Sequence, residues 1–439
     1  MNSLMHNYRW FSPLLLLVIL SSSLAACSET EPKSSSNKSE VELIKSSELR
    51  QTEPTVPQSD LEKLVSGNSR FAFNLYQALR DDDENLFFSP FSISIALAMT
   101  YAGAREQTET QMAETLHYYL PQTHLHPAFN YLDMLLNPLN STGSQEEKAF
   151  QLNIANSLWG QKDYPFLPGF LDVIAMNYGS GLRLVDFIPE DRREEARLAI
   201  NEWVGQQTEQ KILELIEEDI LTEYTRLVLA NAIYFMGDWK DPFLSGTNDD
   251  TFYLLDGSST VVPMMSRRVM TDIVQGDGFQ VIVLPYKGDS IEMVVLLPDS
   301  GEFNDFETSL DADRFNNMLT NVQSFDVRLS MPKFEYETSL KLEKTLAGMG
   351  MPDAFHENLA NFTGMYDFDQ VGRNLFIAHI IHKAYIAVDE KGTEAAAATG
   401  VVAEDESLPM EIRIDRPFIF LIKDNQTGTI LFIGRLIQP

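Results

Sequence analysis

Cysteine and basic residues are scarce in this chain. Cys27 is the single cysteine among 439 residues, so no disulfide can form within the chain and its folded part depends on packing for stability. Hydrophobic residues, at 44%, supply ample core. Lys and Arg number 33 against 64 Asp and Glu, a formal net charge of −31. Nucleic acids and heparin-like polyanions bind through basic patches, so we expect neither as a partner.

Common catalytic motifs are also missing. No G-x-S-x-G elbow, no G-x-x-x-x-G-K phosphate loop and no H-E-x-x-H zinc motif occurs. His124 and His126 could chelate a metal, but their polar, proline-flanked stretch predicts a surface loop. His379 and His382 lie three apart in a predicted strand, so they face opposite sides and cannot readily share a ligand. We therefore expect no cofactor, no metal site and no catalytic activity.

The apolar run at the N-terminus is short. Residues 14–20, which follow Arg9, cannot span a bilayer and are typical of a signal peptide core. The following letters LAAC, ending at Cys27, resemble the cleavage box of bacterial lipoproteins, in which the cysteine becomes the lipidated first residue. Plain secretion with an incidental cysteine is the alternative. The sequence therefore predicts a signal peptide over 1–26 and lipid attachment at Cys27.

Residues 27–57 predict a lipidated N-terminus and a flexible tether, because polar letters such as SSSNKS offer little surface to bury. The domain then covers 58–439. Lipoproteins of bacteria carry more than one acyl chain, and two or more chains give stable anchoring. Ser28 resembles the pattern of outer-membrane rather than inner-membrane retention. We expect an exported protein anchored in the cell envelope by its lipid, with the outer membrane favoured.

Helices and strands mix without regular alternation along the rest of the chain. Residues 279–285 and 292–298 predict two strands, and the turn-forming letters KGD between them indicate a hairpin. This favours antiparallel sheet and the α+β class. Leucines at helical spacing predict a helix over about 60–80, which Asp60 could cap. A second helix is expected over 106–116, where three glutamates make it acidic.

The most informative stretch is residues 390–399, EKGTEAAAAT. In an extended chain alternate side chains share a face, and one face here carries only small or modest residues that could be buried. An ordinary helix or a mobile linker is the alternative, since alanine has the highest helix propensity. The flanking letters HKAYIAVDE and IRIDRPFIF favour the strand. The pattern predicts a strand prepared to enter a sheet to which it does not yet belong.

Together these segments resemble the reactive-loop region of the serpins. Other segments fall in that family's order: NLFFSPFSI at 85–93, NAIYFMGDWKDPF at 231–243, VPMM at 262–265, LLPD at 296–299, MPKF at 331–334 and the C-terminal run 430–439. The resemblance covers roughly residues 60–439. It implies the serpin fold, with mostly antiparallel sheets surrounded by helices and an exposed reactive loop. It also implies a monomeric protease inhibitor rather than an enzyme.

The resemblance assigns roles to three groups of residues. The hinge, where the loop enters the sheet, is Gly392, Thr393, Glu394, Ala395, Ala396, Ala397, Ala398 and Thr399. The shutter, a buried polar cluster under the strands that must part, is Ser89, Ser92, Asn231 and His382. The breach, where insertion starts, is Trp239, Lys333 and Glu390, and we expect an ion pair between the last two. Some serpins bind heparin through a basic helix, whereas the helix over 106–116 is acidic.

The implied mechanism is suicide inhibition of a serine endopeptidase. The protease cuts the exposed loop and forms a covalent acyl-enzyme, and the freed loop then adds to the main sheet as a strand. The inserting hinge face carries neither charge nor proline, which favours an inhibitor. A non-inhibitory serpin, acting as a carrier, chaperone or structural protein, is the alternative. A periplasmic solute-binding lipoprotein would require the resemblance to be accidental.

Loop length predicts the scissile bond. In inhibitory serpins the residue before the cut usually lies fourteen positions after the hinge glycine, which from Gly392 gives Glu406, with Ser407 after it. The primary pocket of the protease should then be basic or hydrogen-bond donating. Cleavage near Val401, Val402 and Ala403 would instead suit an elastase-like enzyme.

Overall fold

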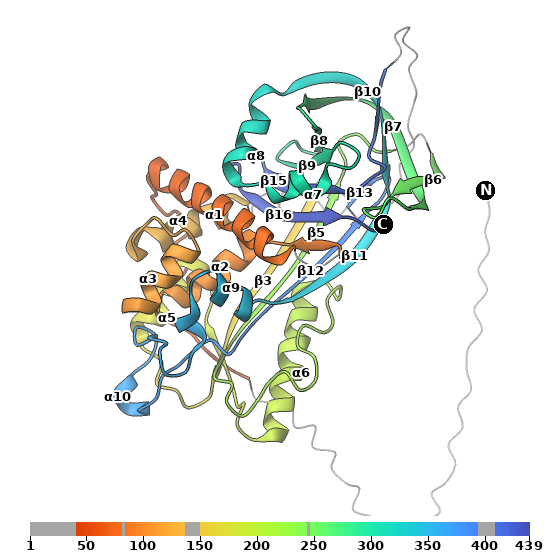
Figure 1. Ribbon diagram of the computed structural model, residues 1–439. Helices are drawn as coiled ribbons and strands as arrows, with labels where there is room; N and C mark the ends of the chain where they lie inside the picture. Colours follow the sequence, from red (N-terminus) through yellow and green to blue (C-terminus); the bar gives the residue numbers. More distant parts are fainter. Residues whose placement is uncertain (1–40, 81–83, 137–149, 244–245, 394–408) are drawn as a thin grey trace, which may run out of the picture. The chain divides into compact units, whose positions relative to one another are not determined.

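The computed structural model describes residues 41–80, 84–136, 150–243, 246–393 and 409–439, all within a unit that runs from Ser39 to Pro439 (Figure 1). The helices in these ranges are α1 (Gln58–Leu79), α2 (Pro90–Tyr101), α3 (Glu106–Thr115), α4 (Gln122–Leu136), α5 (Pro168–Tyr178), α6 (Glu190–Gln207), α7 (Phe303–Thr308), α8 (Ala312–Met318), α9 (Glu343–Met349) and α10 (Phe368–Val371). Short 3₁₀ turns cover Leu319–Asn321 and Pro352–Phe355.

The first sheet has the strand order β1-β4-β3-β5-β12-β11, and β13 pairs with β5. Its strands are β1 (Glu42–Ile44), β3 (Phe150–Gln161), β4 (Leu182–Val185), β5 (Leu227–Asp238), β11 (Phe334–Lys341), β12 (His379–Val388) and β13 (Gly392–Thr393). β5 is central and nearly all of it is buried, as the apolar run LVLANAIYF requires of a strand covered on both faces. β5 pairs antiparallel with β3 and parallel with β12.

The second sheet has the order β14-β10-β7-β8-β9-β15-β16-β2, and β6 pairs with β7. Its strands are β2 (Leu86–Phe88), β6 (Thr247–Tyr253), β7 (Ser259–Gln275), β8 (Phe279–Pro285), β9 (Ile291–Pro298), β10 (Gln323–Pro332), β14 (Met410–Arg413), β15 (Phe418–Asp424) and β16 (Ile430–Leu436). β8 and β9 form the predicted hairpin. Most strand pairs in both sheets are antiparallel, which confirms the α+β class.

Helices cover both faces of the first sheet. α6 lies on one face, where Ile200 and Val204 join a small apolar core with Ala230 and Ala232 of β5 (Figure 1). The larger core on the other face contains α1, α2 and α4. Ser89 is the N-cap of α2, its hydroxyl accepts the backbone N–H of Ser92, and Pro90 occupies the first helical position. This cap places both serines beneath the sheet.

Two predictions about the helices need correction. α1 matches the predicted helix over about 60–80, but Pro57 occupies its N-cap, and Asp60 lies 2.8 Å from His124 Nδ1 instead of capping the helix. The surface loop predicted around His124 and His126 is wrong, because these residues lie in α4. Apolar residues at helical spacing bury one side of α4, and His126 is buried with them beside the Tyr178 hydroxyl. α3 confirms the predicted acidic helix.

Residues 41–57 lie against the domain, although the sequence predicts a tether over 27–57. β1 pairs antiparallel with β4 at the edge of the first sheet. Arg50 Nε donates to Asn130 Oδ1 of α4 at 2.8 Å and also pairs with Asp133, and Gln51 N donates to Met176 O of α5 at 2.9 Å. Residues 1–40, including Cys27, lie outside the described residues. No helix in the described ranges is long and apolar enough to cross a bilayer.

Candidate functional site

The first sheet is open at one end of the boundary between β5 and β12. The two strands pair in parallel up to Tyr234 and Tyr385 and then separate. β13 occupies the space beyond, with Gly392 opposite Asp238 and Thr393 opposite Gly237. A Cβ atom at position 392 would lie 1.9 Å from Gly237 O, so only glycine fits this close approach. The hinge therefore begins where the backbones of Gly392 and Gly237 are in close contact.

Thr393 shows that the first two hinge residues already belong to the sheet. Its side chain is 1% exposed, and its hydroxyl lies 3.0 Å from that of Tyr286. The sequence predicts a strand still outside the sheet, whereas Gly392 and Thr393 belong to it. The other hinge residues, Glu394 to Thr399, lie outside the described residues, as do Glu406 and Ser407 of the predicted scissile bond.

The breach residues hold the base of the loop. Trp239 is 1% exposed and stacks on Tyr286 with ring centroids 4.6 Å apart. Its indole Nε1 donates to Asp389 O at 3.0 Å, and its backbone N–H donates to Lys391 O at 2.7 Å. Trp239 therefore fixes the backbone on both sides of Glu390, through its indole on one side and its own backbone N–H on the other.

The expected ion pair of the breach is present. Lys333 Nζ lies 2.9 Å from Glu390 Oε2, and the hydroxyl of Thr247 donates to the other carboxylate oxygen. Partial burial raises the pKa of the Glu390 carboxyl, but the hydrogen bonds from Thr247 and Lys333 outweigh burial and lower the pKa to about 2. Glu390 is therefore charged at neutral pH.

A buried arginine that the sequence analysis missed lies beside Trp239. Arg267 of β7 is 3% exposed, and its guanidinium carbon lies 4.4 Å from the ring centroid of Phe243. Within the described part of the chain, its Nε and Nη1 atoms have no hydrogen-bond partner. Burial lowers the pKa of Arg267 to about 10, so it stays charged at neutral pH. The breach therefore has a second cationic side chain, buried beside Trp239, in addition to Lys333.

The shutter residues form one buried network between α2 and the first sheet. Asn231 Nδ2 of β5 donates to Ser92 Oγ at 2.7 Å, and Asn231 Oδ1 contacts His382 Nδ1 of β12. The Ser89 hydroxyl donates to Leu431 O at 2.6 Å. The network connects β5 to β12 across the boundary where the strands would part.

Hydrogen bonding fixes the protonation state of His382. Its Nε2 accepts the backbone N–H of Ser89 at 3.2 Å, so this nitrogen carries no proton, and Nδ1 donates to Asn231. Burial lowers the pKa of His382 to about 3, which keeps the ring neutral. Protonation of Nε2 would remove the acceptor and place an uncompensated charge in the core.

Asn156 belongs to the shutter network, although the sequence analysis missed it. This β3 residue pairs with Asn231 in register, and its Nδ2 donates to Ser92 O at 3.2 Å. The signal that could have revealed it is an asparagine within a strand of mostly buried residues. Among the described residues, no group of three or more His, Cys, Asp or Glu could hold a metal ion.

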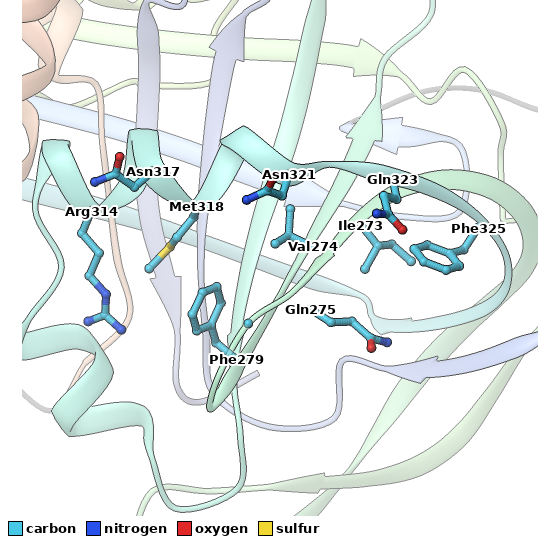
Figure 2. Close-up of a pocket in the computed structure, with 11 residues that line it drawn as sticks. Ile273, Val274, Gln275, Phe279, Arg314, Asn317, Met318, Asn321, Gln323 and Phe325 are labelled. Atoms are coloured by element: carbon cyan, nitrogen blue, oxygen red, sulfur yellow. The ribbon is translucent and has the colours of Figure 1, made fainter.

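A separate cavity of about 540 Å³ lies between α8, the end of β7 and the starts of β8 and β10 (Figure 2). Phe279 and Phe325 supply aromatic surface, and amides of Gln275 and Asn317 line the polar part. Arg314 makes a 3.2 Å hydrogen bond to Phe306 O, and no ion pair of its side chain occurs within the described residues. An amphipathic molecule with a negative group would match this lining.

Known proteins are similar to this chain in both sequence and fold. The model of the family described as serpin (serine protease inhibitor) matches residues 66–439. The leukocyte elastase inhibitor of Sus scrofa is 39% identical over 393 residues, which cover 86% of this chain and 100% of that protein. The native state of the thermophilic serpin tengpin has a TM-score of 0.78 at 28% identity, covering 90% of this chain and 98% of the other. Human thyroxine-binding globulin complexed with thyroxine has a TM-score of 0.76 at 31% identity, covering 87% and 99%.

Proposed function

The chain belongs to the serpin family, whose matched relatives support protease inhibition rather than catalysis, and from this premise we propose that it is a suicide-substrate inhibitor of serine endopeptidases. The single observation that carries the proposal is β13. Gly392 and Thr393 already pair antiparallel with β5 at the open end of the sheet. A loop cut further along could continue along β5 in the same direction and register.

Insertion would displace a protease bound to the cut end of the loop. Roughly fifteen residues at about 3.3 Å each extend on the order of 50 Å, comparable to the width of a domain of this size. Thr393 and the alternate small residues that follow it would meet the core without burying a charge. Displacement over such a distance can distort the acyl-enzyme before its ester is hydrolysed.

The breach supports a controlled start to this process. The Lys333–Glu390 ion pair and the two hydrogen bonds of Trp239 hold the loop base in place in the uncut protein. As residues of the loop join the sheet, the exposed part of the loop becomes shorter, and the backbone around Glu390 must rotate to allow this. These contacts would therefore fix where insertion begins and in which direction it proceeds.

The loop sequence is compatible with two classes of target protease, depending on where it is cut. Glu406 before Ser407 would fit a glutamate-preferring enzyme, whereas cleavage near Val402 and Ala403 would fit an elastase-like enzyme. The leukocyte elastase inhibitor among the matched relatives supports the second class. Both assignments place a covalent acyl-enzyme complex at the end of the reaction.

The proposal includes export and anchoring by lipid on Cys27, with the outer membrane favoured. Its support is the LAAC box after a short apolar run. Changing Cys27→Ala should abolish fatty-acid incorporation in metabolic labelling. Absence of label on the parent would contradict the anchor and leave the inhibitory proposal intact.

A protease panel tests the function. The purified protein should form a complex with its target that survives boiling in detergent, and the N-terminus of the released peptide identifies the cut. A peptide that starts at Ser407 assigns Glu406, and one that starts at Ala403 or Glu404 assigns the elastase-like site. Glu406→Arg should transfer inhibition towards trypsin-like enzymes only in the first case, because their primary pocket is acidic. Rapid cleavage by every protease without any complex would contradict inhibition.

The second candidate function is that of a non-inhibitory carrier, which the cavity beside α8 favours. Its volume suits a small ligand, Arg314 supplies positive charge, and a solved relative is a thyroxine-binding globulin in complex with thyroxine. Titration with the aromatic sulfonate 8-anilinonaphthalene-1-sulfonate should show saturable binding that Arg314→Met weakens. Equal binding by parent and variant would remove the support for this candidate.

A further inference from the structure

The segment between α6 and β5, residues 208–226, contacts strands on both sides of the β5–β12 boundary. Lys383 Nζ of β12 donates to Glu214 O at 2.9 Å, and Lys341 of β11 pairs with Glu217 at 3.1 Å. Lys211 lies nearest the open end of the sheet, with its Nζ 5.7 Å from the ring centroid of Tyr234 and 6.0 Å from that of Tyr385. The segment therefore connects two parts of the sheet that insertion must separate.

The backbone before Lys211 is strained. Glu209 and Gln210 have φ angles of 50° and 64°, a left-handed conformation that costs energy for residues other than glycine. Buried Thr208 stabilises the turn, since its hydroxyl donates to Val204 O at 2.9 Å and accepts Ile212 N–H at 3.2 Å. Gln151 of β3 donates to the carboxylate of Glu209. The turn is thus attached to α6 and β3, and it directs Lys211 at the two rings.

Tyr234 and Tyr385 occupy a special place in the sheet. They are the last directly paired residues of β5 and β12, and three residues further along β5, Thr393 of the hinge pairs with Gly237. An ammonium group within about 6 Å of a ring centroid is attracted by the ring. Lys211 therefore attracts both strands at the point where the next part of the loop would have to enter.

We propose that Lys211 is a positioning residue that slows loop insertion by stabilising the closed arrangement of Tyr234 and Tyr385. Neighbouring strands lie about 4.8 Å apart, so a new strand between β5 and β12 increases their separation to about 10 Å. Lys211 can then stay within reach of only one ring. The contact with both rings belongs to the closed state and is lost on insertion.

This inference rests on the proposed function, because it concerns the rate of insertion. The first two hinge residues already pair with β5 in the uncut protein. If further insertion is to wait for cleavage, a barrier must oppose entry of the next residues. The contact of Lys211 with both rings supplies such a barrier. It also affects inhibition, since a cut loop must insert before the acyl-enzyme hydrolyses.

Peptide uptake by the uncut protein tests the role of Lys211 without a protease. A synthetic peptide of residues 393–406 is added, and its incorporation is followed over time on native gels. Lys211→Met keeps the length of the side chain and removes its charge, and we expect uptake about threefold to tenfold faster than in the parent. Lys211→Arg, which keeps a cation, should restore the parent rate. Lys63→Met on the exposed side of α1 has the same change in net charge and should leave the rate unchanged.

A double-mutant cycle connects the effect to the rings. Tyr385→Leu removes one ring, and Lys211→Met should then accelerate uptake much less than it does in the parent. Additive effects, or equal uptake by Lys211→Met and a parent that does take up peptide, would overturn the inference alone. A parent that neither takes up peptide nor gains thermal stability on loop cleavage would overturn the proposed function together with the inference.

Discussion

At the residue scale, Thr393 tests whether a small, uncharged hinge side chain is required. Thr393→Arg would place a charge against Tyr286 in a site that is 1% exposed, at a cost on the order of 3 kcal/mol. The hinge should leave the sheet and insertion should slow, so proteases cut the variant without being trapped. The number of inhibitor molecules consumed per enzyme inhibited should rise severalfold. Thr393→Ser, which keeps the hydroxyl, serves as the control, and an unchanged ratio in the arginine variant would contradict the role of the hinge.

His382 gives a second prediction at this scale, in the pH dependence of stability. Burial lowers its pKa to about 3 from the ordinary value of 6.5, so the unfolded chain binds the proton more readily. The free energy of unfolding should therefore fall as pH drops below 6.5, by up to about 1.4 kcal/mol per pH unit for this residue. His126, whose pKa burial lowers to about 4, adds a fall of the same sign.

Urea unfolding between pH 5 and pH 6.5 checks this, because Glu390 affects stability only below its ordinary pKa of 4.5. His382→Gln should make the slope of the unfolding free energy with pH shallower by about one proton. His126→Gln, as the comparison, should remove only its own share. The same slope in the parent and in His382→Gln would show that His382 is not the neutral histidine of the shutter.

At the element scale, the segment of residues 41–57 contributes to stability through Arg50. Its guanidinium binds Asn130, which is fully buried, and pairs with Asp133, so Arg50→Ala should lower the free energy of unfolding by about 1–2 kcal/mol. Arg70→Ala removes an exposed ion pair with Asp313 and should cost at most about 1 kcal/mol. If urea unfolding shows that Arg50→Ala and Arg70→Ala lower the free energy of unfolding equally, the contacts of Arg50 do not hold residues 41–57 against the domain.

The helices and strands show which parts of the fold could be predicted from the sequence. The hairpin of β8 and β9 and the acidic helix α3 follow from local patterns, and their bounds agree closely with the predicted ones. The position of residues 41–57 does not follow, since polar letters give no sign that an edge strand of the sheet will accept β1. His126 was misjudged for a related reason: nearby proline and polar residues obscured the apolar spacing that buries one side of α4.

The residues of the candidate site also fall into those that the sequence predicted and those that it did not. Gly392, Lys333 and Glu390 were found through the family's pattern, and the structure brings the latter two into contact. Tyr286, Asn156 and Lys211 were not found, because each acquires its place only when distant strands pair. In the sequence, nothing distinguishes Lys211 from other lysines. Only the register of β5 and β12 brings the two rings together beneath it.

At the scale of the whole molecule, the proposed mechanism requires that the first sheet of the uncut protein can receive another strand between β5 and β12. Gly392 and Thr393 occupy the open end between β5 and β12, while the shutter and Lys211 hold these strands together further along. Insertion would replace these contacts by backbone hydrogen bonds along both strands and by burial of the alternate small hinge residues. The uncut state should therefore be less stable than the cut and inserted one.

The most direct test of this account is the thermal unfolding midpoint before and after a single cut in the reactive loop. We expect the midpoint to rise sharply after cleavage, because an added strand gains hydrogen bonds on both sides, whereas cutting an ordinary loop stabilises nothing. Thr393→Arg should be cut equally well and should show a much smaller rise. An unchanged midpoint after complete cleavage of the parent would contradict insertion and favour the non-inhibitory alternative.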